Sequence, residues 1–205
     1  IDEIITKNPK SKYSANLLAE ESWKSNSDIS KLKKMYEKLD LKFQDSSTIA
    51  VLKSNLFPEK ITLVGKPIFD FELPNENGKK LQSKNYRGKI LFIDFWASWC
   101  EPCRKQMPEI KRIYSKFKKH KFKILAVSLD SKKDKQKWLN TIIKENSTWD
   151  NVIETGEFDS KIAKMYNIQS IPSNFLIDDK GIIIDQNISP EELEEQLHTL
   201  FKTVK

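Results

Sequence analysis

The fold is decided by one stretch of the sequence, ILFIDFWASWCEPC, which spans residues 90–103. Its first seven residues are almost continuously apolar, which predicts a central strand that is covered on both faces. After the cysteines, apolar residues recur at helical spacing up to Phe117, and a second apolar run extends from Phe122 to Leu129. The order strand, helix, strand predicts a parallel pair with a right-handed crossover. The two cysteines then lie where the first strand passes into the helix.

Two hairpins and two more helices are expected around this unit. The turn Asn77-Gly78 predicts an edge hairpin that joins residues 69–73 to the short run after Lys79. The turn at residues 178–181 predicts a second hairpin, and residues 138–143 have the spacing of a helix. Ser189, Pro190 and Glu192 form a capping box that opens a last helix reaching Phe201. The predicted fold class is therefore α/β, with a mixed sheet and helices on both faces.

Residues 1–60 differ from the rest of the chain because their apolar pattern is helical throughout. Helices are expected over residues 13–23 and 29–39, the second capped by Asp28. A third would open at Ser46 or Ser47 and stop at Pro58. We therefore expect an N-terminal helical extension over residues 1–60 and an α/β domain over residues 61–205.

The composition is that of a soluble globular protein, with 38% hydrophobic and 32% charged residues among 205. No stretch approaches the roughly 18 apolar residues of a membrane-spanning helix. Because the first residue is Ile and not Met, we expect a portion of a longer product. Any targeting segment or membrane attachment is then expected outside this sequence.

The net charge of +7 is concentrated in the middle of the chain, where residues 104–123 hold nine basic residues against the single acid Glu109. Nucleic-acid binding is not expected, since these residues neither alternate with exposed aromatics nor form a recognisable motif. Two interpretations stay open for the basic stretch: a solvated helix face, or a field that steers acidic partners.

The only two cysteines, Cys100 and Cys103, are separated by two residues. A zinc site is not expected, because there is no second cysteine pair and the only histidines are His120 and His198. A purely structural disulfide across so short a segment would restrict the unfolded chain very little. The pattern therefore favours redox chemistry.

At the helix N-terminus the thiolate of Cys100 is favoured, so Cys100 is expected to be the exposed nucleophile with a depressed pKa. Cys103 is expected to be the covered, resolving thiol, and no cofactor beyond the redox-active disulfide is expected.

Three further residues invite a functional and a structural interpretation. Asp94 lies inside the buried strand, where it is either a proton relay for Cys103 or an acid bonded to its neighbours. Glu101 either raises the pKa of the nucleophile or is a solvated acid. Pro172 precedes a strand, where a trans bond is the usual state.

The segment at residues 95–104 followed by Met107-Pro108 resembles the active-site segment of the thioredoxin superfamily, and most closely its TlpA/ResA-like envelope branch. The segments at 126–130 and 170–178 and Gly181 keep that family's order and spacing, so the resemblance covers about residues 61–205. It implies a thioredoxin-like fold, thiol-disulfide oxidoreductase activity and a periplasmic or cell-envelope location. The implied partners are protein thiol or disulfide substrates and an upstream electron-donor protein.

The resemblance also assigns roles to residues around the cysteines. It implies that Pro172 is a cis-proline, that the backbone of Ile171 pairs with an extended substrate, and that Trp99 flanks the nucleophile. Asp94 matches the buried acid of thioredoxins, and Glu101 and Pro102, between the cysteines, are expected to modulate them.

Two departures from the family concern the residues around the proton route. Gln106 stands where many ResA-like proteins have Glu, and residues 124–129 lack the Lys that thioredoxins place on the next strand.

Three rival functions remain to be tested against the sequence. A peroxiredoxin-like peroxidase would have its peroxidatic cysteine without an adjacent partner, and a thioredoxin-fold binding module commonly loses the pair. A copper-delivery relative would have more widely spaced cysteines and a nearby His. Turnover of a disulfide substrate with and without Cys100 discriminates among these functions.

Overall fold

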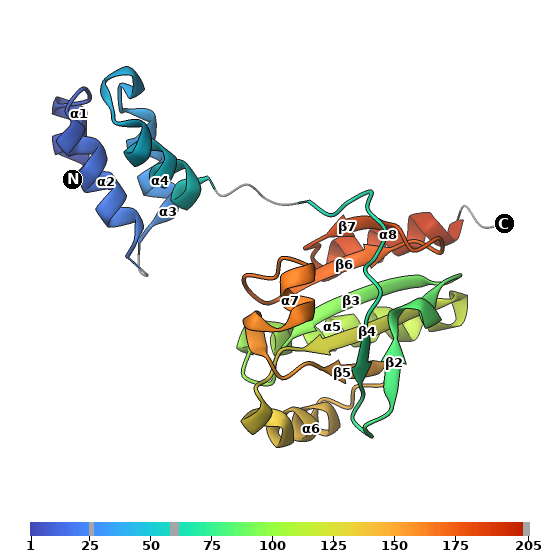
Figure 1. The fold of residues 1–205 in the computed structure, drawn as a ribbon. Helices are drawn as coiled ribbons and strands as arrows, with labels where there is room; N and C mark the ends of the chain where they lie inside the picture. The colour runs from blue at the N-terminus through green and yellow to red at the C-terminus, as the bar shows by residue number, and fades with distance from the viewer. Residues whose placement is uncertain (25–26, 58–61, 203–205) are drawn as a thin grey trace. The chain divides into compact units, whose positions relative to one another are not determined.

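The computed structural model describes residues 1–24, 27–57 and 62–202, which belong to two compact units, Ile1–Ile61 and Thr62–Lys205. Figure 1 shows the elements of both units. The first unit has one hydrophobic core and the second has two. The units are described separately below.

The first unit is helical in its described part. Its α-helices are α1 (Asp2–Lys7), α2 (Lys12–Ser22), α3 (Ile29–Glu37) and α4 (Ser46–Leu56). Asp28 caps α3 as predicted, since its carboxylate accepts a hydrogen bond from the Lys31 N–H at 3.0 Å. Helix α4 begins at Ser46 with Asp45 as its N-cap, and the expected stop at Pro58 lies outside the described residues. Helix α1 was not predicted, because six residues with one buried side chain, Ile5, give no periodicity.

The second unit is built on a mixed five-stranded sheet in the order β5-β4-β3-β6-β7. The strands are β3 (Ile90–Trp96), β4 (Phe122–Ser128), β5 (Asp150–Ile153), β6 (Ser173–Ile177) and β7 (Ile183–Gln186). The pairs β3-β4 and β4-β5 are parallel, whereas β3-β6 and β6-β7 are antiparallel. Strand β5 was not predicted, since its four residues include Asp150 and Asn151 and show no alternation.

Helices cover both faces of the sheet, as predicted (Figure 1). Helices α5 (Glu101–Phe117), α6 (Lys135–Lys144) and α8 (Pro190–Lys202) contribute to one core together with Phe92 and Trp96. Helix α7 (Lys161–Met165) contributes to the other, together with Leu91, Ile93 and Phe95. Successive side chains of β3 thus point to opposite faces. The capping box of α8 is confirmed, because Ser189 N donates to Glu192 Oε2 at 2.7 Å and Glu192 N to Ser189 Oγ at 3.2 Å.

The Asn77-Gly78 hairpin forms, but it does not extend the edge of the main sheet. Strands β1 (Glu72–Pro74) and β2 (Lys80–Gln82) make a separate two-stranded sheet, and a single bridge joins Asn75 to Val152. Leu73 anchors this hairpin in the core on the α7 side. The hairpin thus lies beside the edge strand β5, as expected, but it forms a sheet of its own and does not add a strand to the main sheet.

Candidate active site

The two cysteines lie at the carboxyl end of β3, where the chain enters α5. Cys100 is the N-cap of α5, and its sulfur is bonded to that of Cys103 with an S–S distance of 2.03 Å. The backbone N–H of Cys103 donates a hydrogen bond to Cys100 Sγ at 3.2 Å. The helix thus directs an N–H group at the first sulfur, as a helix N-terminus does toward an anion.

Both cysteines are 4% exposed, so the expectation that Cys100 is exposed was wrong for the disulfide form. Cys100 and Cys103 belong to the same apolar cluster as Trp96 and Met107. The difference in exposure between the two thiols stays a prediction for the reduced protein.

A buried acid that the sequence analysis did not select holds the loop in front of the cysteines. Asp130 is 0% exposed and accepts hydrogen bonds from Ser98 N at 2.8 Å, Ser98 Oγ at 2.6 Å and Ser128 Oγ at 2.7 Å. Ser98 lies two residues before Cys100, so Asp130 links the end of β4 to the active-site loop. The feature of the sequence that could have indicated Asp130 is its position directly after a buried strand, which neighbours the strand that leads to the cysteines.

Asp94 is buried in β3 and lies on the α5 side of the sheet. It alternates with Phe92 and Trp96, which share a core with Cys103. Burial raises the pKa of the Asp94 carboxyl to about 7. Among the described residues, none donates a hydrogen bond to the Asp94 carboxyl group. The side chain of Asn174, its cross-strand neighbour, instead forms hydrogen bonds with the backbone C=O and N–H of Ile188. A carboxyl group in this state can accept or release a proton near neutral pH.

The residues that the resemblance assigned to substrate binding differ in exposure. Trp99 is 42% exposed, and its ring faces that of Phe158 with centroids 6.4 Å apart. Ile171 and Pro172 are half-buried, and the peptide bond between them is cis. Ile171 packs against both cores of the unit, and one of these contains the two cysteines.

The residues between the cysteines are solvated. Glu101 and Pro102 are exposed, and Glu101 Oε1 forms an ion pair with Lys105 Nζ at 2.8 Å. This pairing favours the interpretation of Glu101 as a surface acid of the first helical turn. Gln106, one of the two departures from the family pattern noted in the sequence, is half-buried.

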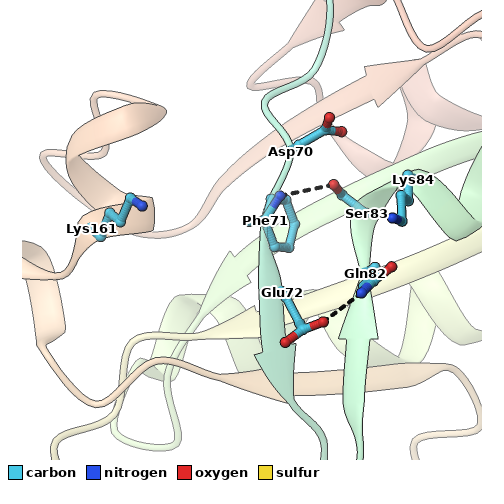
Figure 2. Close-up of a pocket in the computed structure, with 7 residues that line it drawn as sticks. All are labelled: Asp70, Phe71, Glu72, Gln82, Ser83, Lys84 and Lys161. Atoms are coloured by element: carbon cyan, nitrogen blue, oxygen red, sulfur yellow. Dashed lines mark hydrogen bonds between the residues drawn. The ribbon is translucent and has the colours of Figure 1, made fainter.

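In the described ranges, no group of three His, Cys, Asp or Glu side chains is arranged to hold a metal ion. A pocket of about 430 Å³ lies between the β1-β2 hairpin and Lys161 at the start of α7 (Figure 2). Figure 2 shows two hydrogen bonds among the lining residues: Phe71 N donates to Ser83 Oγ at 3.1 Å, and Gln82 Nε2 to Glu72 Oε2 at 2.5 Å.

The two cysteines are separated by two residues and form a disulfide at the start of the helix that follows the central strand. This arrangement defines a thioredoxin-fold protein with a redox-active pair. The AhpC/TSA family model matches residues 64–186. The chain belongs to this family, and within it to the TlpA/ResA-like thiol-disulfide oxidoreductases. It is accordingly an oxidoreductase that acts on thiols and disulfides.

Relatives and solved structures agree on this assignment. The chain is 33% identical over 141 residues to thiol-disulfide oxidoreductase ResA of Bacillus thuringiensis, which covers 69% of this chain and 78% of the relative. It is 32% identical over 152 residues to ResA of Geobacillus kaustophilus, with coverage of 72% and 84%. A thiol-disulfide oxidoreductase from Bacteroides fragilis is 37% identical with a TM-score of 0.61, covering 66% of this chain and 99% of that one. No helix in the described part of the chain is both long and apolar enough to span a bilayer.

Proposed function

We propose that this chain exchanges disulfides with protein substrates in the cell envelope, with Cys100 as the nucleophile and Cys103 as the resolving thiol. The carrying observation is the position of Cys100 as the N-cap of α5, with the Cys103 N–H on its sulfur. In the reduced protein, the same N–H and the helix dipole favour the Cys100 thiolate. The envelope location is supported by the ResA relatives and by a structural neighbour described as a thiol:disulfide interchange protein DsbE from Chlorobium tepidum, 27% identical.

The proposed reaction moves two electrons from the cysteine pair to a substrate disulfide. The Cys100 thiolate attacks one substrate sulfur, the substrate S–S bond breaks, and one substrate thiolate leaves. Cys103 then loses its proton and attacks Cys100 Sγ, which releases the second substrate thiolate and forms the Cys100–Cys103 disulfide. An upstream donor protein with a dithiol must reduce that disulfide to close the cycle.

Asp94 is proposed to accept the proton of Cys103. Burial raises the pKa of a thiol and slows its ionisation, so the resolving step needs a base within the core. Asp94 faces the core that contains Cys103, and its carboxyl group has a pKa of about 7. Both properties support a proton relay over a purely structural acid.

The substrate is proposed to bind as an extended segment across Trp99, Ile171 and Pro172. Trp99 is exposed directly before the nucleophile, and the half-buried Ile171 and Pro172 lie at the entry to β6, the antiparallel neighbour of β3. Apolar surface beside a reactive sulfur favours a peptide over a small polar disulfide.

The test compares three forms of the full chain with a disulfide-bonded peptide and dithiothreitol as reductant. With dithiothreitol the parent should turn over and Cys100→Ser should not, whereas Cys103→Ser that is reduced and then freed of dithiothreitol should accumulate a peptide joined to Cys100, detectable by mass spectrometry. Turnover by Cys100→Ser, or a peptide joined to residue 103 in a Cys100→Ser sample, would reverse the roles. Turnover of hydrogen peroxide in place of the peptide would favour the peroxidase alternative.

A further inference from the structure

Phe158 is an aromatic residue that is held at the surface next to the active site. It is 36% exposed and belongs to neither hydrophobic core of its unit. Its ring faces Trp99, which is itself 42% exposed and directly precedes Cys100. Two large apolar side chains therefore remain partly in water beside the reactive sulfur, an arrangement typical of interaction sites.

The loop that carries Phe158 follows β5 and is held in place from both sides. The Glu154 carboxylate accepts a hydrogen bond from Ile162 N at 2.8 Å, and Ser160 Oγ accepts one from Ala163 N at 3.2 Å. Gly156 packs so closely on Ser160 that a Cβ at this position would lie 2.9 Å from the Ser160 Cα. The loop thus presents Phe158 in a preorganised position, which lowers the entropy cost of binding against it.

The loop also lies at the same edge of the sheet as the cysteines. Strands β3, β4 and β5 are parallel, so the chain leaves β5 at Ile153 on the edge where it leaves β3 at Trp96. The Phe158 ring therefore extends the apolar surface that begins at Trp99. A segment bound to Cys100 and lying over Trp99 would meet Phe158 next.

We propose that Phe158 and Trp99 form a docking surface for an apolar side chain close to the target cysteine of an extended protein substrate. This inference rests on the proposed function and deepens it, since it makes Phe158 a specificity-determining residue. The occupant is the disulfide-bearing segment of the substrate, because only a group joined to Cys100 is held over this surface during the reaction. Aromatic side chains at the centre of a contact contribute most of its binding energy.

The test is a measurement of selectivity between two peptide disulfides that differ only in the residue after the cysteine, Leu or Ser. The parent should show a higher kcat/KM for the Leu peptide. Phe158→Ala should lower the ratio of the two kcat/KM values about tenfold, as removal of one apolar contact does in other specificity sites. Phe158→Leu should retain most of the preference.

Ile143→Ala is the matched control. Ile143 is 76% exposed in the last turn of α6, at the opposite edge of the sheet, and its removal should leave the ratio unchanged. A ratio that is the same in Phe158→Ala and the parent, or one that falls equally in Ile143→Ala, would overturn the inference while leaving the proposed function intact. A parent that turns over neither peptide, or a Cys100→Ser variant that turns over both, would overturn the proposed function and the inference with it.

Discussion

At the scale of single residues, the chemistry depends on one carboxyl group in an apolar core. Burial raises the pKa of Asp94 from 3.8 to about 7, so the folded protein binds a proton here that the unfolded chain releases at lower pH. The contribution of this group to stability is fully present below the unfolded pKa of about 4 and is lost as pH rises through about 7. Above that pH the folded state contains a buried, unpaired charge.

Asp94→Asn is therefore expected to stabilise the protein more at high pH than at low pH. The pKa rise corresponds to about 4 kcal/mol at pH 8, an upper limit that core relaxation reduces, and to little at pH 4. Urea unfolding at the two pH values measures the difference, with exposed Asp179→Asn as the control. A variant that is equally destabilised at both pH values would show that the carboxylate is a structural acid.

The same substitution should slow the second chemical step and spare the first. If Asp94 accepts the Cys103 proton, the rate of mixed-disulfide resolution in the parent should rise as pH passes about 7. In Asp94→Asn this inflection should disappear and resolution should slow by about 100-fold, within the usual range for a lost general base. Stopped-flow release of a chromophoric peptide thiol separates the two steps. An unchanged pH profile would exclude the relay.

At this scale the two cysteines and Asp94 were selected because each is an anomaly in its own segment, whereas the cis bond at Pro172 was predicted only from the resemblance to the family. Asp130 and Phe158 were missed for a physical reason. An Asp after a strand and a Phe in a polar loop are common in protein sequences. The roles of these two residues depend on their contacts with Ser98 and Trp99, which are distant in the sequence.

At the scale of elements, the connection between β3 and α5 is held by hydrogen bonds to Asp130. Its carboxylate accepts from one N–H and two hydroxyl groups, all inside the protein. The element pattern itself was predictable where strands and helices are long, as in β3, α5 and α8. The short elements α1, β5 and α7 were not, because their packing partners decide them.

Asp130→Ala should destabilise the protein by about 3 kcal/mol, since it leaves three buried donors without an acceptor. It should also lower the rate of the first attack by Cys100, because Ser98 no longer fixes the loop. Asp130→Asn retains one acceptor oxygen and should lose less on both measures. Urea unfolding and single-turnover kinetics give the two values, with the exposed Asp159→Ala as control. A loss below about 1 kcal/mol in Asp130→Ala would mean that the network contributes little.

At the scale of the whole chain, the described parts contain separate cores on either side of the expected boundary near residue 60. The helical core contains side chains from Ile5 to Leu56, and the two cores of the sheet unit contain side chains from Ile68 onward. We expect a chain that starts at residue 62 to fold alone and to keep the kcat/KM of the full chain for a peptide disulfide. Calorimetry and the peptide assay test this expectation. An unfolded fragment would show that residues 1–61 are part of the domain.

Part of the positive charge of the basic stretch at residues 104–123 is compensated by ion pairs. Arg104, Lys105, Arg112 and Lys116 form ion pairs, the last two with Glu194 of α8. The lysines at 118–121 lie beside the start of β4, at the edge of the sheet opposite the cysteines. The structure thus favours a solvated face, because several of these charges are paired and the lysines at 118–121 lie at the edge of the sheet away from the reactive sulfur.

Ionic strength should therefore have a weak effect on the reaction with an acidic substrate. Seven residues of β3 at about 3.3 Å each separate the two edges by roughly 20 Å, whereas the Debye length is already about 10 Å at 0.1 M salt. The association rate of a disulfide peptide that carries Glu residues should change by less than about tenfold between 0.01 and 1 M salt, below the range of steered encounters. Gln substitution of Lys118, Lys119 and Lys121 together should leave that rate the same. A steep salt dependence that this triple variant abolishes would instead establish electrostatic steering by the far edge.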